Sequence, residues 1–254
     1  MPEDLQEMRT EAVEDFLKAV YVLQRQVEWV PTTLLARSLN ISAPSVTDMV
    51  KRLAGIEDDK DREKGKVPGR KLVNPLLEYR PYHGVQLTAT GEKIALEVIR
   101  HHRLLELYLS QALGYTWDEV HAEADKLEHV ISEQFEARIA DMLGNPEIDP
   151  HGDPIPALDG TITASDRILL SDLAVDQPGT VSQIADQAPE VLRYLSELGL
   201  TPGTPVLLTS RAPLNDTVSL RIGDADTLQT ISTQVARKVL VTPEQTPHPS
   251  KDPC

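Results

Sequence analysis

The ten residues HAEADKLEHV, at positions 121–130, place carboxylates and imidazoles together on one side of a predicted helix. At about 100° per residue, His121, Asp125, Glu128 and His129 fall within an arc of roughly 100°, beside the arc that holds the apolar residues. Solvated helix faces usually mix Lys and Arg with acidic residues, but this arc carries only groups that bind divalent cations. The stretch therefore predicts a site for a divalent metal ion.

Two other predicted helices supply groups of the same kind. In the helix expected over residues 91–112, His102 and Glu106 stand four residues apart and can bind one ion together. Asp15, in a helix expected over residues 10–27, is a further candidate, which spacing alone does not connect with the others. The helices over 91–112 and 116–144 thus present three histidines and three carboxylates, a set that favours a metal site.

A helix-turn-helix precedes these helices. Thr32 or Thr33 can cap a short helix, residues 40–42 form a turn, and Ser42 can cap a second helix with Pro44 in its first turn. Two β-prone runs around a turn at residues 81–84 follow, and a hairpin in this place is a wing. We therefore expect DNA contacts from the second helix. The residues concerned are Ser42, Pro44, Ser45, Thr47, Asp48, Lys51 and Arg52.

The rest of the chain divides by composition. A charged insertion over about 57–75 separates the second helix from the wing. The helices of residues 91–145 have more apolar surface than one small domain needs, which predicts a dimer interface. The expected fold is mainly α with a small β domain. Its parts are a winged helix-turn-helix over 1–90, a helical domain over 91–145, a Pro-rich linker over 146–160, an SH3-like β-barrel over 161–242 and a disordered tail over 243–254.

Composition limits the function further. The formal net charge of −15 argues against a generally basic nucleic-acid binder, but the charge is uneven. Residues 31–75 carry nine Lys and Arg against six acidic residues, whereas residues 101–160 carry three against thirteen. The single cysteine, Cys254, excludes a disulfide framework and Cys-based zinc or redox motifs. No apolar run of about 18 residues occurs, so we expect a soluble cytoplasmic protein without a membrane partner.

Six stretches, in this order along the chain, resemble the diphtheria-toxin-repressor family of metal-activated bacterial transcription repressors. They are SAPSVTDMVKRL, PYHGVQLTATG, RHHRLLELYL, WDEVHAEADKLEHVIS, PHGDPIP and YLSELGLTPGTPV. The resemblance implies a winged-helix domain, a helical domain for dimerisation and metal binding, and an SH3-like C-terminal domain. It also implies a homodimer that binds double-stranded operator DNA and controls metal-uptake genes, rather than an enzyme.

The resemblance further implies which residues bind metal. Motif matching assigns Asp15, Asp125, Glu128 and His129 to a primary site and His102, Glu106 and His121 to an ancillary site, to which Glu190 can add a ligand. Iron-responsive members have Met and Cys at the first two of these positions. The carboxylates here resemble the manganese-responsive branch and imply Mn²⁺, with Fe²⁺ as the alternative. Some manganese regulators also have Glu where this chain has Lys18.

The expected mechanism is linkage between metal and DNA. An ion at the primary site would join the first helix to the helical domain and favour the DNA-binding arrangement. Without metal, the carboxylates are expected to repel one another and loosen the first helix. Two alternatives stay open: a winged-helix regulator without metal dependence, and a metal-dependent hydrolase or oxidase. The sequence contains no nucleophile elbow, phosphate-binding loop or HExxH helix to favour the enzyme.

Overall fold

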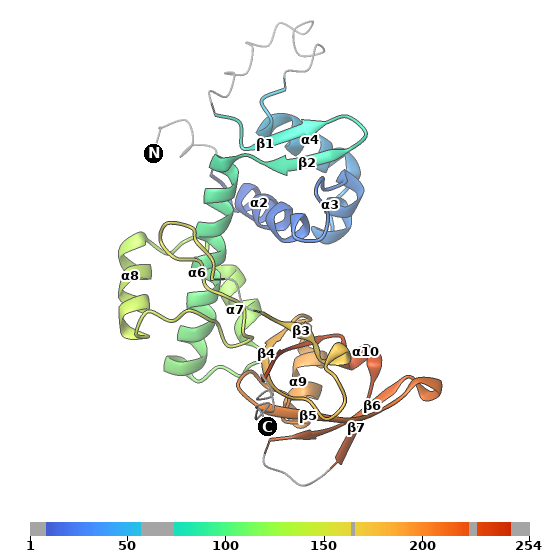
Figure 1. The fold of residues 1–254 in the computed structure, drawn as a ribbon. Helices are drawn as coiled ribbons and strands as arrows, with labels where there is room; N and C mark the ends of the chain where they lie inside the picture. Colours follow the sequence, from blue (N-terminus) through green and yellow to red (C-terminus); the bar gives the residue numbers. More distant parts are fainter. Residues whose placement is uncertain (1–8, 57–73, 164–165, 224–227, 245–254) are drawn as a thin grey trace, which may run out of the picture. The chain divides into compact units, whose positions relative to one another are not determined.

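The computed structural model describes residues 9–56, 74–163, 166–223 and 228–244 (Figure 1). Most of the predicted charged insertion and almost all of the predicted tail lie outside these residues. The chain forms two compact units. The first contains residues 1–101, 128–131 and 156–161, and the second contains residues 102–127, 132–155 and 162–254.

The predicted helix-turn-helix is confirmed in the first unit. Helix α2 (Glu11–Gln24) is followed by α3 (Thr32–Ser38) and α4 (Ala43–Leu53). Ser42 caps α4 as expected, because its Oγ accepts a hydrogen bond from the backbone N–H of Ser45 at 3.3 Å. The apolar side of α4 is buried in a core that it shares with α2 and α3.

The predicted wing is also present, as the antiparallel strands β1 (Leu77–Arg80) and β2 (Gly84–Leu87) beside α4 (Figure 1). Val30 and Val85 exchange backbone hydrogen bonds of 2.9 and 3.0 Å, which fasten the wing to the segment before α3. Gly84 has φ +129, and a Cβ there would lie 2.2 Å from the carbonyl oxygen of Val30. Only glycine permits this close approach.

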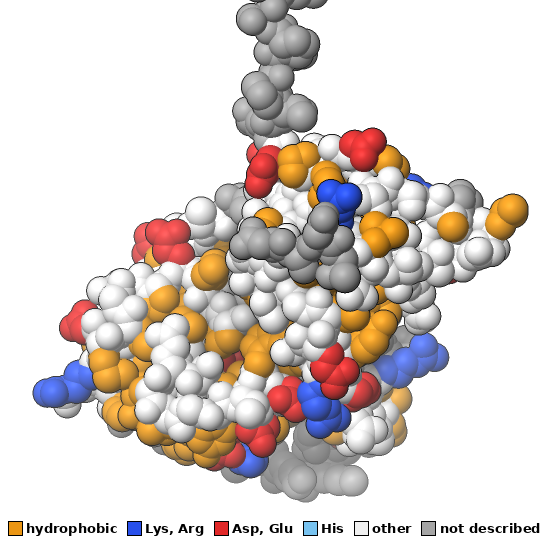
Figure 2. Space-filling model, turned by 90° about the horizontal axis from the view of Figure 1, so that it is seen from below, with side chains coloured by type: hydrophobic (Ala, Val, Ile, Leu, Met, Phe, Trp, Pro, Cys, Tyr) orange, Lys and Arg blue, Asp and Glu red, His pale blue; other side chains and the backbone are white. Residues whose placement is uncertain are grey.

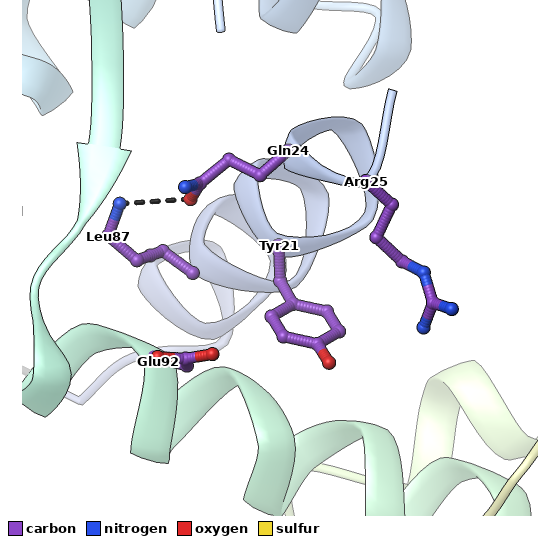
Figure 3. A pocket seen from close by; sticks show the side chains of 5 residues that line it. All are labelled: Tyr21, Gln24, Arg25, Leu87 and Glu92. Atoms are coloured by element: carbon purple, nitrogen blue, oxygen red, sulfur yellow. Dashed lines mark hydrogen bonds between the residues drawn. The ribbon is translucent and has the colours of Figure 1, made fainter. Parts of the chain in front are cut away.

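A pocket of about 270 Å³ lies where the end of α2, strand β2 and the start of α6 (Ala89–Leu113) meet (Figure 3). Gln24 fixes one wall of the pocket, since its Oε1 accepts a hydrogen bond from the Leu87 N–H at 2.9 Å. Tyr21, Arg25 and Glu92 line the rest. This arrangement ties α2 to the wing, so a change in the position of α2 would reach the DNA-binding elements directly.

The prediction of a single helix over residues 116–144 is wrong. The structure has α7 (Val120–Leu127) and α8 (Glu133–Met142), and Ser132 starts α8 by accepting a hydrogen bond from the Phe135 N–H at 3.3 Å. Glu128 and His129 therefore lie in the connection between the two helices and not on the helical face inferred from spacing. That connection belongs to the first compact unit, whereas α7 and α8 belong to the second.

The second unit contains an open antiparallel sheet with strand order β3-β8-β4-β5-β6-β7. Its strands are β3 (Ile168–Leu169), β4 (Pro178–Ile184), β5 (Pro205–Ala212), β6 (Thr217–Ile222), β7 (Leu228–Ser232) and β8 (Val239–Pro243). The same unit also contains the helices α9 (Pro189–Glu197) and α10 (Thr233–Ala236) and two short 3-10 helices, η1 (Leu170–Asp172) and η2 (Pro213–Asn215).

The small β domain expected over residues 161–242 is confirmed, but its sheet does not close into a barrel, because the edge strands β3 and β7 do not pair with each other among the described residues. Strand β3 has only two residues, too few backbone groups to close a barrel. The sequence patterns also missed β4 and β7. Within the described part of the chain, no helix is both long enough and apolar enough to cross a membrane.

Candidate metal centres and DNA-binding surface

A first cluster of possible ligands consists of Glu14, Asp15, Glu128 and His129, all in the first unit. His129 Nε2 lies 3.1 Å from Asp15 Oδ1 and 3.5 Å from Glu128 Oε1. On the other side of the ring, His129 Nδ1 lies 2.7 Å from Glu14 Oε2. A histidine that donates Nδ1–H to a carboxylate keeps Nε2 available as a metal ligand. The structure thus brings three of the four predicted primary ligands together.

Glu14 was not predicted, although it is 6% exposed and directly precedes Asp15. Glu14 lies beside the apolar stripe of α2, three residues before the buried Leu17. This position in the sequence could have indicated that its side chain is buried. Arg9 Nε holds the other Glu14 oxygen at 2.7 Å. Glu14 is therefore placed to orient the His129 ring, not to take the ion itself.

We predict that Glu14→Gln weakens metal binding at the first cluster about 10- to 100-fold, the usual effect of losing a carboxylate that orients a ligating histidine. Isothermal titration of Mn²⁺ into the chelator-treated protein would measure this change. Glu92→Gln, at an exposed position on α6, is the matched control and should leave the affinity unchanged. An unaltered affinity in Glu14→Gln would show that His129 needs no such orientation.

Charge in the first cluster is partly balanced without an ion. Lys18 Nζ lies 2.9 and 2.8 Å from the two carboxylate oxygens of Glu128, a side chain that is almost fully buried. Burial raises the pKa of Asp15 above its ordinary value; His129 and Lys18 oppose this rise, and Glu128 adds to it. Added positive charge would lower the pKa of Asp15 again, as expected of a cation site.

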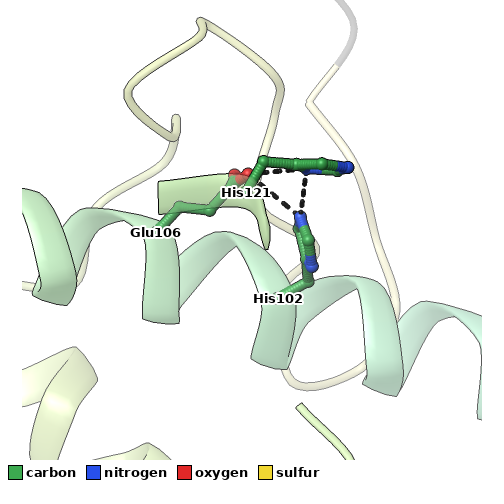
Figure 4. Close-up of side chains that lie close together, drawn as sticks. All are labelled: His102, Glu106 and His121. Atoms are coloured by element: carbon green, nitrogen blue, oxygen red, sulfur yellow. Dashed lines mark hydrogen bonds and ion pairs between the residues drawn. The ribbon is translucent and has the colours of Figure 1, made fainter. Parts of the chain in front are cut away.

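A second cluster consists of His102, Glu106 and His121 in the second unit, as predicted (Figure 4). His102 Nε2 lies 3.0 Å from Glu106 Oε1 and 3.0 Å from His121 Nδ1, and that Nδ1 lies 3.1 Å from the same Glu106 oxygen. Adjacent ligand atoms around an octahedral ion with bonds of about 2.1 Å are about 3.0 Å apart. The three atoms therefore have the spacing that one ion requires.

Asp125 lies beside this second cluster. Its carboxylate oxygens are 3.3 Å from His102 Nδ1 and 3.6 Å from His121 Nε2, the ring nitrogens that point away from Glu106. In this position Asp125 can orient both histidines from outside the ligand set. Its predicted convergence on Asp15 in the primary site stays a prediction.

A third cluster, missed by the sequence patterns, is formed by Glu106, Asp149 and His151. All three side chains are buried. His151 Nε2 donates to the Trp117 carbonyl at 3.0 Å, so in the neutral ring Nδ1 carries a lone pair. This Nδ1, Glu106 Oε2 and Asp149 Oδ2 have no hydrogen-bond partner among the described residues. Three buried acceptors thus converge. Arg103 supplies part of the positive charge that they require, since its Nε lies 3.7 Å from Asp149 Oδ2, and protons or a cation would supply the rest.

The ionisation of the third cluster agrees with this need. Burial raises the pKa of Asp149 to about 8, and the charges of Glu106 and Asp153 add to this effect. Burial alone would lower the pKa of His151, but Glu106 and Asp149 raise it above its ordinary value. Burial also opposes ionisation of Glu106, yet His102, His121 and His151 hold the pKa of Glu106 well below its usual range. Glu106 is thus the common anion of the second and third clusters.

The motif PHGDPIP builds the third cluster through its backbone. Asp149 Oδ1 accepts hydrogen bonds from the N–H groups of His151 and Asp153 at 2.8 and 2.9 Å. Gly152 has φ +86, and a Cβ there would lie 2.0 Å from the Ser182 carbonyl oxygen on β4. Of the segment expected to be a Pro-rich linker, residues 146–155 therefore belong to the second unit, and residues 156–160 belong to the first.

Glu190, the predicted ligand from the β domain, is exposed in the first turn of α9. It belongs to none of the groups of possible metal ligands among the described residues. Asp186, which lies nearby in the sequence, is paired with Lys238 at 2.7 Å. A ligand from α9 stays a prediction.

The predicted DNA-contacting residues lie together on the side of α4 opposite to its buried face. Ser42, Pro44, Ser45, Thr47, Asp48 and Arg52 are exposed, and Lys51 is half-buried. On the face drawn in Figure 2, Lys and Arg side chains are few and are separated by acidic and apolar ones. The face drawn there therefore presents no broad basic surface for DNA.

Comparisons with known proteins match three successive parts of the chain to known domains. Residues 8–57 match the model of the iron dependent repressor N-terminal DNA binding domain, residues 88–157 that of the iron dependent repressor metal binding and dimerisation domain, and residues 168–243 that of the FeoA domain. The iron-dependent repressor IdeR of Mycobacterium leprae is 28% identical over 77% of this chain and 83% of the relative. The diphtheria toxin repressor of Corynebacterium diphtheriae is 30% identical over 73% of this chain and 71% of the relative.

Among solved structures, the fold is similar to one described as a manganese-dependent transcriptional repressor in complex with manganese. The two chains superpose with a TM-score of 0.76 and 33% sequence identity, over 91% of this chain and 100% of the other. The likeness therefore covers both units.

Proposed function

The chain belongs to the diphtheria toxin repressor family of metal-dependent transcriptional repressors, and from this premise we propose that Mn²⁺ activates it to bind operator DNA as a homodimer. The genes under its control would be those of metal uptake. A regulatory role, not catalysis, is the proposed activity. The observation that carries the proposal is the first cluster, in which Asp15 of α2 and Glu128 of the connection after α7 each place an oxygen within 3.5 Å of His129 Nε2.

Each residue of the first cluster has a proposed role. Asp15 binds from α2, Glu128 and His129 bind from the connection after α7, and Glu14 holds the His129 ring. A bound divalent cation supplies the positive charge that these carboxylates share. Since α2 packs on α3 and is joined to the wing through Gln24, holding α2 also holds the DNA-binding elements. Metal and DNA affinity are then coupled in both directions.

Mn²⁺ is proposed because the ligands of the first cluster are oxygen and nitrogen atoms, without thiolate or thioether. The solved manganese-dependent repressor that superposes on this chain supports the same ion. Fe²⁺ is the alternative, because it accepts similar ligands and lies above Mn²⁺ in intrinsic affinity. Selectivity for Mn²⁺ would have to come from geometry or from the availability of free ions.

We assign a second, ancillary ion to His102, Glu106 and His121. Glu106 Oε2 accepts no hydrogen bond from the described residues and lies 3.7 Å from His151 Nδ1, which extends this assignment to Asp149 and His151. The ion would then replace protons in the third cluster. Glu106 would then bridge the two sets of ligands. The ion would tie α6 and α7 to the segment that holds Gly152 against β4.

For the domains we propose DNA binding by residues 1–90, dimerisation by 91–145, a linker over 146–160 and an SH3-like domain over 161–242. The order of the matched ranges supports this division. Exposed apolar side chains on or next to α6 and α8 support the dimer. They are Leu113, Val130, Phe135 and Met142.

The proposal is tested by mobility shift on the native operator with Mn²⁺ and with excess chelator. We expect binding only with Mn²⁺. Equal affinity in both conditions would overturn metal activation and favour a winged-helix regulator without metal dependence. A metal-loaded protein without any DNA binding would instead favour the hydrolase or oxidase alternative.

A further inference from the structure

Lys18 stands inside the first cluster and already binds one of its ligands. The ammonium group contacts both oxygens of Glu128, at 2.9 and 2.8 Å, across 110 residues of sequence. The Lys18 side chain is 21% exposed and the Glu128 side chain is 1% exposed. A buried carboxylate requires a positive partner, and Lys18 supplies it in this structure.

The same carboxylate is a proposed metal ligand. Lys18 follows Asp15 by three residues, so both side chains leave α2 on one side and reach the connection after α7. The Lys18 ammonium contacts both oxygens of Glu128 and therefore occupies lone pairs that this carboxylate would use to bind an ion. Two cations at hydrogen-bonding or bonding distance from one carboxylate would also repel each other strongly in a buried place. Lys18 and a divalent ion therefore compete for Glu128.

We propose that Lys18 is a tethered cation that holds Glu128 in the metal-free protein and has to leave when the ion binds, so that it sets the metal concentration at which the protein responds. The inference rests on the proposed function and adds to it a residue that lowers the metal affinity. Lys18 has the flexible four-carbon stem and the partial exposure that let its charge move into water. Each binding event then includes the loss of the Lys18–Glu128 ion pair, which weakens the apparent affinity.

This role changes the expected metal-free state. Repulsion among the carboxylates was expected to loosen the first helix. Instead, Lys18 on Glu128 and Arg9 on Glu14 neutralise two of them, while His129 bonds to Glu14 and Asp15. Helix α2 is thus held near residues 128–131 without an ion, and metal binding exchanges one set of contacts for another.

The test is direct titration of Mn²⁺ into chelator-treated full-length protein, in parallel with thermal unfolding. Lys18→Gln should bind Mn²⁺ about tenfold more tightly, the effect of removing one competing charge-assisted contact. The same variant should unfold at a lower temperature than wild type in chelator and recover most of the difference in Mn²⁺. Lys93→Gln, at an exposed position on α6, removes an equal charge and should change neither quantity.

Lys18→Arg keeps a cation that pairs with carboxylates through two hydrogen bonds, and it should not bind Mn²⁺ more tightly than wild type. It also keeps the test decisive if Lys18→Gln does not fold. Unchanged or weaker binding by folded Lys18→Gln, or tighter binding by Lys18→Arg, would overturn the competition. Failure of the wild type to bind Mn²⁺ at all would instead overturn the proposed function.

Discussion

Replacing Glu128 by glutamine is expected to lower the Mn²⁺ affinity of the first cluster by at least about 100-fold and to abolish metal-activated DNA binding. Loss of an orienting partner alone costs about 10- to 100-fold, so loss of a charged ligand costs no less. His121→Ala should only weaken the response, because His121 belongs to the second cluster. The glutamine side chain has the size of glutamate, so the main change is the lost charge.

Calorimetric titration of Mn²⁺ and operator binding by fluorescence anisotropy measure the two effects. Glu123→Gln on α7 is the matched control, since the exposed pair of Glu123 with Lys126 should contribute little. Because Glu128→Gln also removes the partner of Lys18, the double variant Lys18→Gln with Glu128→Gln separates the loss of a ligand from an unpaired ammonium. Recovery of wild-type affinity in that double variant would exclude Glu128 as a ligand. A stronger effect of His121→Ala than of Glu128→Gln would mean that the primary and ancillary roles are reversed.

The second large effect concerns which ion is sensed. Asp15→Met with Asp125→Cys introduces a thioether and a thiolate, which bind softer ions, and removes a carboxylate from α2. We expect the double variant to lose most of its Mn²⁺ response, on the order of 100-fold, if both carboxylates act as assigned. Activation by Fe²⁺, Co²⁺ or Ni²⁺ should be kept or increased.

Operator binding against each free metal, under anaerobic conditions for iron, gives the ranking for the wild type and the variant. The two single variants, Asp15→Met and Asp125→Cys, distinguish between two possible roles of Asp125. If Asp125 binds the ion with Asp15, both single variants lower the Mn²⁺ response. If it acts only where the structure places it, beside His102 and His121, Asp125→Cys leaves the first cluster unchanged. Identical metal rankings in wild type and double variant would remove the physical basis for a manganese sensor.

The sequence alone was sufficient for features that repeat within one element or follow one another closely. Ser42, Pro44 and the apolar spacing after them predicted α4, because capping and periodicity are local properties. The wing followed from two short runs around one turn. His102 and Glu106 were recognised as a pair because residues four positions apart in a helix lie on the same face.

Periodicity failed where the helix stopped. The pattern of residues 121–130 continued smoothly through Glu128 and His129, but Ser132 begins a new helix and the backbone turns before it. Whether a periodic stretch forms one helix or two depends on competing tertiary contacts, which the spacing of apolar residues does not contain. The failure to predict the open sheet has the same cause. Whether its edge strands pair depends on strand length and on β-bulges in the three-dimensional structure.

Only the tertiary structure decided the composition of the metal centres. Glu14 and Lys18 lie more than 100 positions from His129 and Glu128, and nothing in the order of residues joins them. Asp149 and His151 lie in a Pro-rich segment that composition alone marks as a linker, yet backbone hydrogen bonds and Gly152 hold them against Glu106. Residue types show which groups can bind a cation, whereas burial and distance decide which of them share one and which are already neutralised by a lysine.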